Sequence, residues 1–198
     1  TDLIDVPGLG QTHMSIVDMA NLHVFVRASD VGLDTSQSIF DLQVDTALVQ
    51  RLEHVRAAAC QHIGFGAGHD MDELMRISVN PLLFVVAPPR AYTTNTGDAV
   101  AADDHDLFAR SMARYEFSKA YPGSGSVGTA VAAGLPGTLA HEATRPSAIA
   151  TRAFTLRVGH PGGTLSVDAA VNPQDHAVAY ARLGRTARLL MDGRAYYR

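Results

Sequence analysis

The chain has 198 residues, of which 46% are hydrophobic, 18% charged and 7% aromatic, and its formal net charge is −4. This composition is typical of a globular domain and excludes a disordered or collagen-like chain, while the single cysteine, Cys60, excludes a disulfide framework and a thiolate-rich metal site. No apolar run approaches the ~20 residues of a membrane helix and no signal-peptide pattern opens the chain, so we expect a soluble, cytoplasmic domain.

The first part of the chain alternates strand and helix patterns. Residues 14–17 and 23–27 are rich in Val and Phe and predict two strands joined by a polar turn at 18–21. Asp45 is placed to cap a helix that Gly64 ends. The apolar residues of this helix recur at helical spacing: Leu48, Leu52, Val55, Ala59 and Ile63.

The middle of the chain predicts a surface segment, a buried strand and a second helix. Residues 66–78 form a surface helix or loop in this interpretation, and residues 79–87 form a buried strand that Pro88 and Pro89 close. A helix is expected to begin near Asp103, with Asp106 placed as in a capping box. Its apolar face would consist of Leu107, Phe108, Met112 and Tyr115.

A run of small residues predicts a central helix. Residues 127–133 are small and apolar on every side, so they favour a buried helix, which Pro136 and Gly137 would end. The rest predicts strands at 138–142, 153–158, 164–170, 177–182, 186–191 and 195–197, with Asp192-Gly193 as a hairpin turn. We therefore expect one α+β domain over residues 1–198, with strands around the small-residue helix.

The loop before this helix is a candidate anion site. Gly123, Gly125 and Gly128 spell G-x-G-x-x-G, but Pro122 and a predicted helix precede them where a dinucleotide fingerprint needs a strand, so dinucleotide binding is disfavoured. A glycine loop that enters a helix offers free N–H groups and a positive dipole end to a carboxylate or phosphate. Ser124 and Ser126 would add hydroxyl groups. A plain N-cap and tight turn is the alternative.

A second glycine-rich segment contains a histidine. In Gly159-His160-Pro161-Gly162-Gly163 the glycines would let a ligand approach the backbone, and His160 could donate to an anion or move a proton. The alternative is a glycine-rich hairpin with an exposed histidine. Asn21 and His23 are polar groups in a strand context and are more often turn residues than ligands.

Other chemistries find little support. The nine histidines lack the spacing of a metal site, Cys60 lies among alanines as a structural thiol would, and no G-x-S-x-G segment indicates a hydrolase. Residues 145–198 hold eight basic and three acidic side chains, but the whole chain is acidic, with a pI near 6.1. Nucleic acid is therefore disfavoured, which leaves a small polyanion or an arginine-rich surface.

Several segments, in order, resemble the methylaconitate isomerase family, whose members isomerise unsaturated tricarboxylates and related acids. They are SIVDMAN (15–21), VFVRA (24–28), LFVVAPP (83–89), 119–133, LPGT (135–138), RVGHPGG (157–163) and RTARLLMDG (185–193). The resemblance covers essentially the whole chain. It implies a fold like that of diaminopimelate epimerase, in which each of two domains wraps a mixed or antiparallel sheet around a central helix.

The resemblance also implies what this chain contributes. It is similar to the C-terminal half of these enzymes, whose catalytic lysine and cysteine belong to the first half; Lys119 and Cys60 match neither motif, so the catalytic residues stay unassigned. The implied enzyme needs no cofactor and no metal. Its partners would be a small polycarboxylate, the N-terminal domain of the same enzyme and a second copy of the chain, with no nucleic acid and no membrane.

The resemblance places the substrate near the N-terminus of the central helix. The expected substrate-binding residues are Ser124, Gly125, Ser126, His160, Gly162, Gly163 and Asn21. Relatives usually carry Asn-Pro where this chain has Asn21-Leu22, and a serine where it has Gly162. The alternative is a stand-alone, non-catalytic domain that binds an anionic metabolite or a partner chain.

Overall fold

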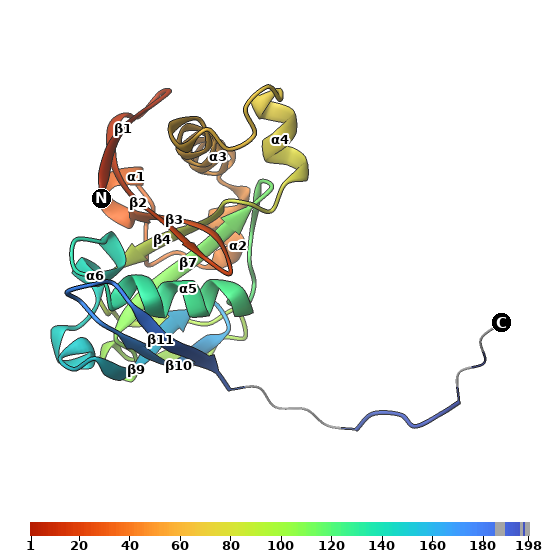
Figure 1. Ribbon diagram of the computed structural model, residues 1–198. Coiled ribbons are helices and arrows are strands. Elements are labelled where there is room, and N and C mark those ends of the chain that lie inside the picture. Colours follow the sequence, from red (N-terminus) through yellow and green to blue (C-terminus); the bar gives the residue numbers. More distant parts are fainter. Residues whose placement is uncertain (185–188, 195, 197–198) are drawn as a thin grey trace.

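A large sheet bends around one buried helix in the computed structural model, which describes residues 1–184, 189–194 and 196 (Figure 1). Within these residues the sheet has nine strands in the order β1-β2-β3-β4-β7-β9-β10-β11, and β8 pairs with β7. The strands are β1 (Asp2–Val6), β2 (Gly10–Met19), β3 (Asn21–Arg27), β4 (Leu82–Ala87), β7 (Leu107–Ala113), β8 (Glu116–Phe117), β9 (Ala153–His160), β10 (Gly163–Val171) and β11 (Val178–Leu183).

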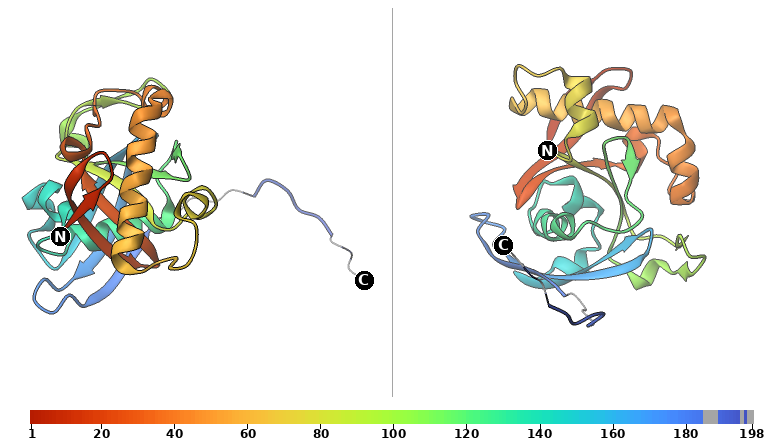
Figure 2. Two further views of the ribbon diagram at one scale, coloured as in Figure 1. Left: turned by 90° about the horizontal axis from the view of Figure 1, so that it is seen from above. Right: turned by 90° about the vertical axis from the view of Figure 1, so that its right-hand side faces the viewer.

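The sheet is mixed and wraps around helix α5 (Gly123–Ala133). β3 runs parallel to β4 and β7 parallel to β9, whereas the other neighbouring pairs are antiparallel. α5 contacts β2 and β3 on one side and β10 and β11 on the other, and the right-hand view of Figure 2 shows the helix nearly end-on with strands on both sides. The expected α+β architecture, a mixed sheet around a central helix, is confirmed.

Each face of the sheet carries its own hydrophobic core. On the outer face pack α1 (Ala28–Val31), α2 (Ile39–Val44) and α3 (Thr46–Ile63), and α4 (Met71–Ile77) lies beyond α3. α5 and α6 (Leu139–Ala143) fill the inner face. Two short strands, β5 (Tyr92–Thr93) and β6 (Ala99–Val100), form a separate hairpin, and 3₁₀ turns lie at Ala102–Asp104 and Pro146–Ile149. No helix in the described part of the chain is long and apolar enough to cross a bilayer.

α3 forms where its capping signals predict. The Asp45 side chain accepts from the N–H of Leu48, and Gly64 ends the helix in the left-handed conformation at φ 72°. The inner side of α3 also buries an ion pair between Glu53 and Arg56. Arg56 donates further to the carbonyl groups of the segment that leads into β4, so it fastens the helix to the strand.

Two glycines let α5 lie directly on aromatic rings of the sheet. A Cβ atom at Gly125 would lie 2.5 Å from the Phe84 ring, and a Cβ atom at Gly128 would lie 2.5 Å from the His23 ring. Real side-chain contacts are not this short, so larger residues would push the helix away from β3 and β4. Close approach explains why the central helix is built from small residues.

Two predicted elements are wrong in type. The helix expected from Asp103 is a short 3₁₀ turn followed by strand β7, because both faces of Leu107–Ala113 are covered and its apolar residues therefore show no strict alternation. The strand expected at 138–142 is helix α6, which begins after Thr138, whose hydroxyl accepts from the N–H of His141.

The expected C-terminal hairpin is not formed where it can be assessed. Residues 189–194 carry no strand, and the side chains of Leu189, Leu190 and Met191 are more than 80% exposed. The remaining positions of that hairpin, 186–188, 195 and 197, lie outside the described residues. The other predicted strands, 153–158, 164–170 and 177–182, correspond to β9, β10 and β11.

The substitution Gly128→Ala tests the close packing of α5. Helix propensity alone would stabilise the chain by up to about 1 kcal/mol, whereas contact with the His23 ring should destabilise it by about 1–3 kcal/mol. Urea unfolding of this variant should therefore show a loss of stability. Gly184→Ala is the control, because nothing lies within 4 Å of the added Cβ there. A gain at Gly128 would contradict the packing.

Candidate functional site

The hairpin between β2 and β3 brings Asn21 to the first turn of α5. Ala20 takes a positive φ of 62° at the turn, and Asn21 then begins β3. The Asn21 Nδ2 group donates to Ser124 Oγ at 2.7 Å. Both side chains are half-buried, so this contact between residues 103 positions apart lies at the edge of the molecule's interior.

The N-terminus of α5 is not capped by a side chain. Pro122 occupies the cap position and has no hydroxyl or carboxylate to offer, and the first turn contains no acidic residue. The first helical N–H bond joins Ser126 N to Pro122 O at 2.8 Å. Positive helix termini of this kind favour a carboxylate or phosphate.

The segment predicted as a loop before the central helix is the first turn of α5, and its two serines differ in availability. Ser126 is fully buried, and its hydroxyl donates to the Gly123 carbonyl at 2.7 Å, within the first turn of the helix. Ser124 is half-buried and pairs with Asn21. Gly125 is buried against Phe84. Ser124 is therefore the hydroxyl that lies nearest to solvent.

The turn at residues 159–163 joins β9 to β10 and is held rigidly. The Tyr92 hydroxyl donates to the Gly163 carbonyl at 2.5 Å, and the Asn95 N–H donates to the Pro161 carbonyl at 2.7 Å. Within the turn, the Gly162 N–H donates to His160 Nδ1 at 3.2 Å. This bond leaves Nε2 as the nitrogen that carries the proton of a neutral imidazole.

A row of rings connects this turn to the helix. The Tyr121 ring lies 5.9 Å from that of His160 and 5.5 Å from that of Phe84, and Phe84 packs on Gly125. The hydroxyl groups of Tyr121 and Thr129 share a hydrogen bond of 2.8 Å, which ties the row to α5. The structure thus brings Asn21 and Ser124 into contact and places the His160 turn across the Tyr121 ring from α5.

Burial sets the charge state of the titratable groups nearby. It lowers the pKa of His23 and His105, and burial together with the Arg110 charge lowers the pKa of His160 to about 4. Burial raises the pKa of the Cys60 thiol to about 11. Cys60 is therefore a protonated core residue, in agreement with its prediction as a structural thiol.

Arg110 is a buried residue that sequence reasoning missed. It lies on β7 with 2% of its surface exposed, next to the 159–163 turn. The available signal was a lone arginine inside the apolar run from Leu107 to Met112. The prediction of a helix there hid this signal, because a helix would have allowed the arginine to face solvent.

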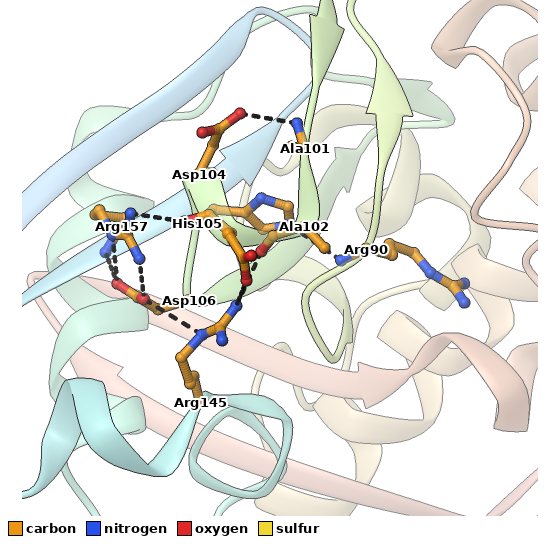
Figure 3. Close-up of polar contacts among 9 residues, drawn as sticks. Arg90, Ala101, Ala102, Asp104, His105, Asp106, Arg145 and Arg157 are labelled. Atoms are coloured by element: carbon orange, nitrogen blue, oxygen red, sulfur yellow. Dashed lines mark hydrogen bonds and ion pairs between the residues drawn. The ribbon is translucent and has the colours of Figure 1, made fainter.

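An ion-pair network fixes β9 beside the start of β7 (Figure 3). The Arg157 guanidinium donates two hydrogen bonds to the Asp106 carboxylate, at 2.6 and 3.0 Å. Arg145 forms an ion pair with the same carboxylate at 3.9 Å. Burial alone would raise the pKa of Asp106, but the hydrogen bonds and charges of these arginines outweigh it and hold the pKa below its usual value. Asp106 thus anchors the strand that ends at His160.

A cavity of about 490 Å³ lies at the end of β3 and β4 opposite to Asn21. None of the predicted site residues lines it. Its Arg27 is paired with Asp30 at 3.1 Å and with Glu142 at 2.5 Å, so its charge is already balanced. No cluster of His, Cys, Asp or Glu suited to a metal ion occurs among the residues that the structure describes.

Comparison with known proteins gives a consistent result over the whole chain. The family described as PrpF protein matches residues 1–198. The chain is 31% identical to a 2-methyl-aconitate isomerase of Shewanella oneidensis over 97% of its own length and 47% of the relative. It is 33% identical to a 3-methylitaconate isomerase of Eubacterium barkeri, over 94% of its own length and 48% of the relative.

A solved structure agrees with these sequences. The crystal structure of a methylitaconate-delta-isomerase superimposes with a TM-score of 0.85 at 32% identity, over 97% of this chain and 48% of that one. The chain therefore spans about half the length of the relatives it matches.

Two buried histidines and the half-buried His160 should make the fold less stable in acid. Because His23, His105 and His160 have lowered pKa values when folded, the unfolded chain binds more protons below pH ~6.5. Stability should fall as pH drops from about 6.5 toward 4, by up to about 1.4 kcal/mol per pH unit for each histidine. The raised pKa of Glu53 acts in the opposite direction and offsets at most one of the three.

Urea unfolding at pH 7.5, 6.5 and 5.5 measures this slope. His160→Gln should reduce the slope of the free energy of unfolding against pH, whereas the same substitution at the exposed His69 should not. A free energy of unfolding that stays constant over this range would contradict the neutral, buried state of the histidines.

Proposed function

The chain belongs to the PrpF family, and we propose that it is the C-terminal domain of a cofactor-independent isomerase that moves a double bond in an unsaturated tricarboxylate. Two relatives named as 2-methyl-aconitate and 3-methylitaconate isomerases support this substrate class. The observation that carries the proposal is the family match across residues 1–198 together with an uncapped helix N-terminus at the centre of the fold.

The proposed reaction is a proton transfer. A base removes a proton from the carbon next to the double bond, and the electron pair of that C–H bond delocalises into the neighbouring carboxylate as a dienolate. Return of a proton to a different carbon completes the isomerisation, so no atom is gained or lost. Such a reaction needs a base, an acid, and hydrogen-bond donors for the carboxylates and for the developing negative charge.

This chain supplies donors in the proposed enzyme. The first-turn N–H groups of α5 and the Asn21–Ser124 pair would bind one carboxylate. The backbone at Gly162 and Gly163 and the Nε2–H group of His160 would bind another from the neighbouring turn. Because both groups of donors are fixed by packing, they need little reorganisation when charge develops on the substrate.

The base and the acid are proposed to come from the N-terminal domain of the same enzyme. Within this chain, Cys60 is fully buried in α3 as a protonated thiol. The Lys119 ammonium lies 5.9 Å from the Phe40 ring, at the α2 side of the molecule. Neither residue is therefore assigned a part in the proton transfer.

Binding of tricarballylate, a saturated tricarboxylate, tests the donor site. Ser124→Ala removes one hydroxyl and leaves the Asn21 amide unpaired. The dissociation constant of tricarballylate should therefore rise about tenfold, as expected for the loss of one hydrogen bond to a charged group. Ser166→Ala is the matched control, because Ser166 is exposed on β10. Calorimetry that shows equal affinity for the two variants would contradict the assignment of Ser124.

Hydrogen exchange tests the division of labour. In D2O the chain by itself should bind trans-aconitate weakly. It should not catalyse exchange of the carbon-bound protons of trans-aconitate with solvent deuterium, since the proposed base lies in the other domain. Proton NMR of the substrate measures the exchange. Deuterium uptake that depends on the chain would contradict the division, and a complete lack of tricarboxylate binding would contradict the proposed substrate class.

A further inference from the structure

Among the residues that the structure describes, two arginines are almost fully buried, and their charges are balanced differently. Arg56 pairs with the buried carboxylate of Glu53. Arg110 makes no ion pair in the described part of the chain, and the sequence has no Asp or Glu among the remaining residues. A buried charge without a counter-ion is strongly unfavourable for folding, so Arg110 is a candidate for a functional role.

The Arg110 guanidinium lies beneath the turn that carries His160. The parallel pairing of β7 with β9 ends at Phe108 and Gly159, so Arg110 comes just beyond the point where β9 turns away. Its Nη1 donates to the Ala109 carbonyl at 2.9 Å and reaches the Gly159 carbonyl at 3.5 Å, while Nε has no partner. The Phe108 and Tyr92 rings lie 3.9 and 4.9 Å from the guanidinium carbon.

We infer that Arg110 is a positioning residue for His160: its buried positive charge, added to the burial of the ring, disfavours a second positive charge in the 159–163 turn, so that His160 stays a neutral imidazole donating from Nε2 when it contacts an anionic substrate. The Gly162 N–H group fixes the tautomer by donating to Nδ1. A neutral imidazole donates a hydrogen bond without passing a proton to the carboxylate it binds, and the Arg110 charge behind it still favours an anion.

The groups around His160 are consistent with this role. Arg110 on β7 reaches the carbonyl of the neighbouring Gly159 at 3.5 Å, the Tyr121 ring lies 5.9 Å from the His160 ring, and Tyr92 on β5 binds the Gly163 carbonyl. The buried His105 ring lies against Gly159 and packs on Tyr92, as Arg110 does. In the part of the chain that the structure describes, no carboxylate forms an ion pair with His160 that would favour its protonated form.

The pKa shifts point the same way. Burial and the Arg110 charge lower the pKa of His160 to about 4, so the imidazole is neutral at pH 7. Burial lowers the pKa of Arg110 to about 10, which leaves the guanidinium charged at pH 7. Burial also raises the pKa of Tyr92 and of Tyr121, so both phenols stay uncharged.

Nitrogen and proton NMR of the imidazole rings tests the inference without any ligand. In the unsubstituted chain His160 should be the Nε2–H tautomer at pH 7 and should titrate near pH 4, its signal being the one that His160→Gln removes. Arg110→Met should raise this midpoint by up to about one pH unit, because the burial of the ring remains. Arg110→Lys keeps the charge and should leave the midpoint low, which separates charge from packing. The His69 signal serves as the internal control.

Two results would overturn the inference. One is a His160 that titrates near the ordinary 6.5 in the unsubstituted chain, a measurement that needs no variant to fold. The other is a midpoint that Arg110→Met leaves unchanged while thermal unfolding shows that the variant is folded. Either result removes Arg110 from control over the histidine.

The identity of the ligand rests on the proposed function. A second measurement distinguishes failure of the proposed function from failure of the link between Arg110 and His160. At pH 7 the tricarballylate dissociation constant should rise about tenfold in Arg110→Met and less than threefold in Arg110→Lys. Absence of tricarballylate binding, combined with the expected His160 titrations, would contradict the proposed function and still support the link between Arg110 and His160. Equal affinity in Arg110→Met and the unsubstituted chain would overturn the effect on the substrate.

Discussion

The close approach of α5 to the aromatic rings of β3 and β4 is the constraint on which the rest of the structure depends. Gly125 and Gly128 leave room for Phe84 and His23, so the helix lies directly on the sheet. A sheet can bend around a helix of this kind because the helix is built from small residues and contacts strands on both sides. The result is two cores, with the outer one covered by α3.

The same packing places the candidate site. With its first turn resting on Phe84, α5 presents its uncapped N-terminus beside the β2–β3 hairpin, where Asn21 meets Ser124. Tyr121 then fills the space between the helix and the 159–163 turn. Asn21 and Ser124 meet, and the 159–163 turn lies across Tyr121 from α5, because one helix has a fixed depth in the fold.

Charge at the site is set by burial as much as by pairing. Asp106 and Arg157 form a balanced pair that fixes β9, whereas Arg110 is buried beneath the end of that strand without a carboxylate in the described residues. His160 is the last residue of the same strand, and burial together with the Arg110 charge keeps it neutral. The positive potential of the proposed site therefore comes from the buried Arg110 and from the N-terminus of α5, while His160 acts as a neutral hydrogen-bond donor.

Local signals in the sequence determined α3, from its Asp45 cap to Gly64, and α5, from its small residues; the ordered segments of the family resemblance determined the fold class. Tertiary structure decided that residues 107–113 are a strand, since burial on both faces removes the alternation by which a strand is recognised. It also decided which polar groups meet. The Asn21–Ser124 contact spans 103 positions, and the Arg110–Gly159 contact spans 49. Such contacts follow from the order of strands around a helix, which no local pattern of residues encodes.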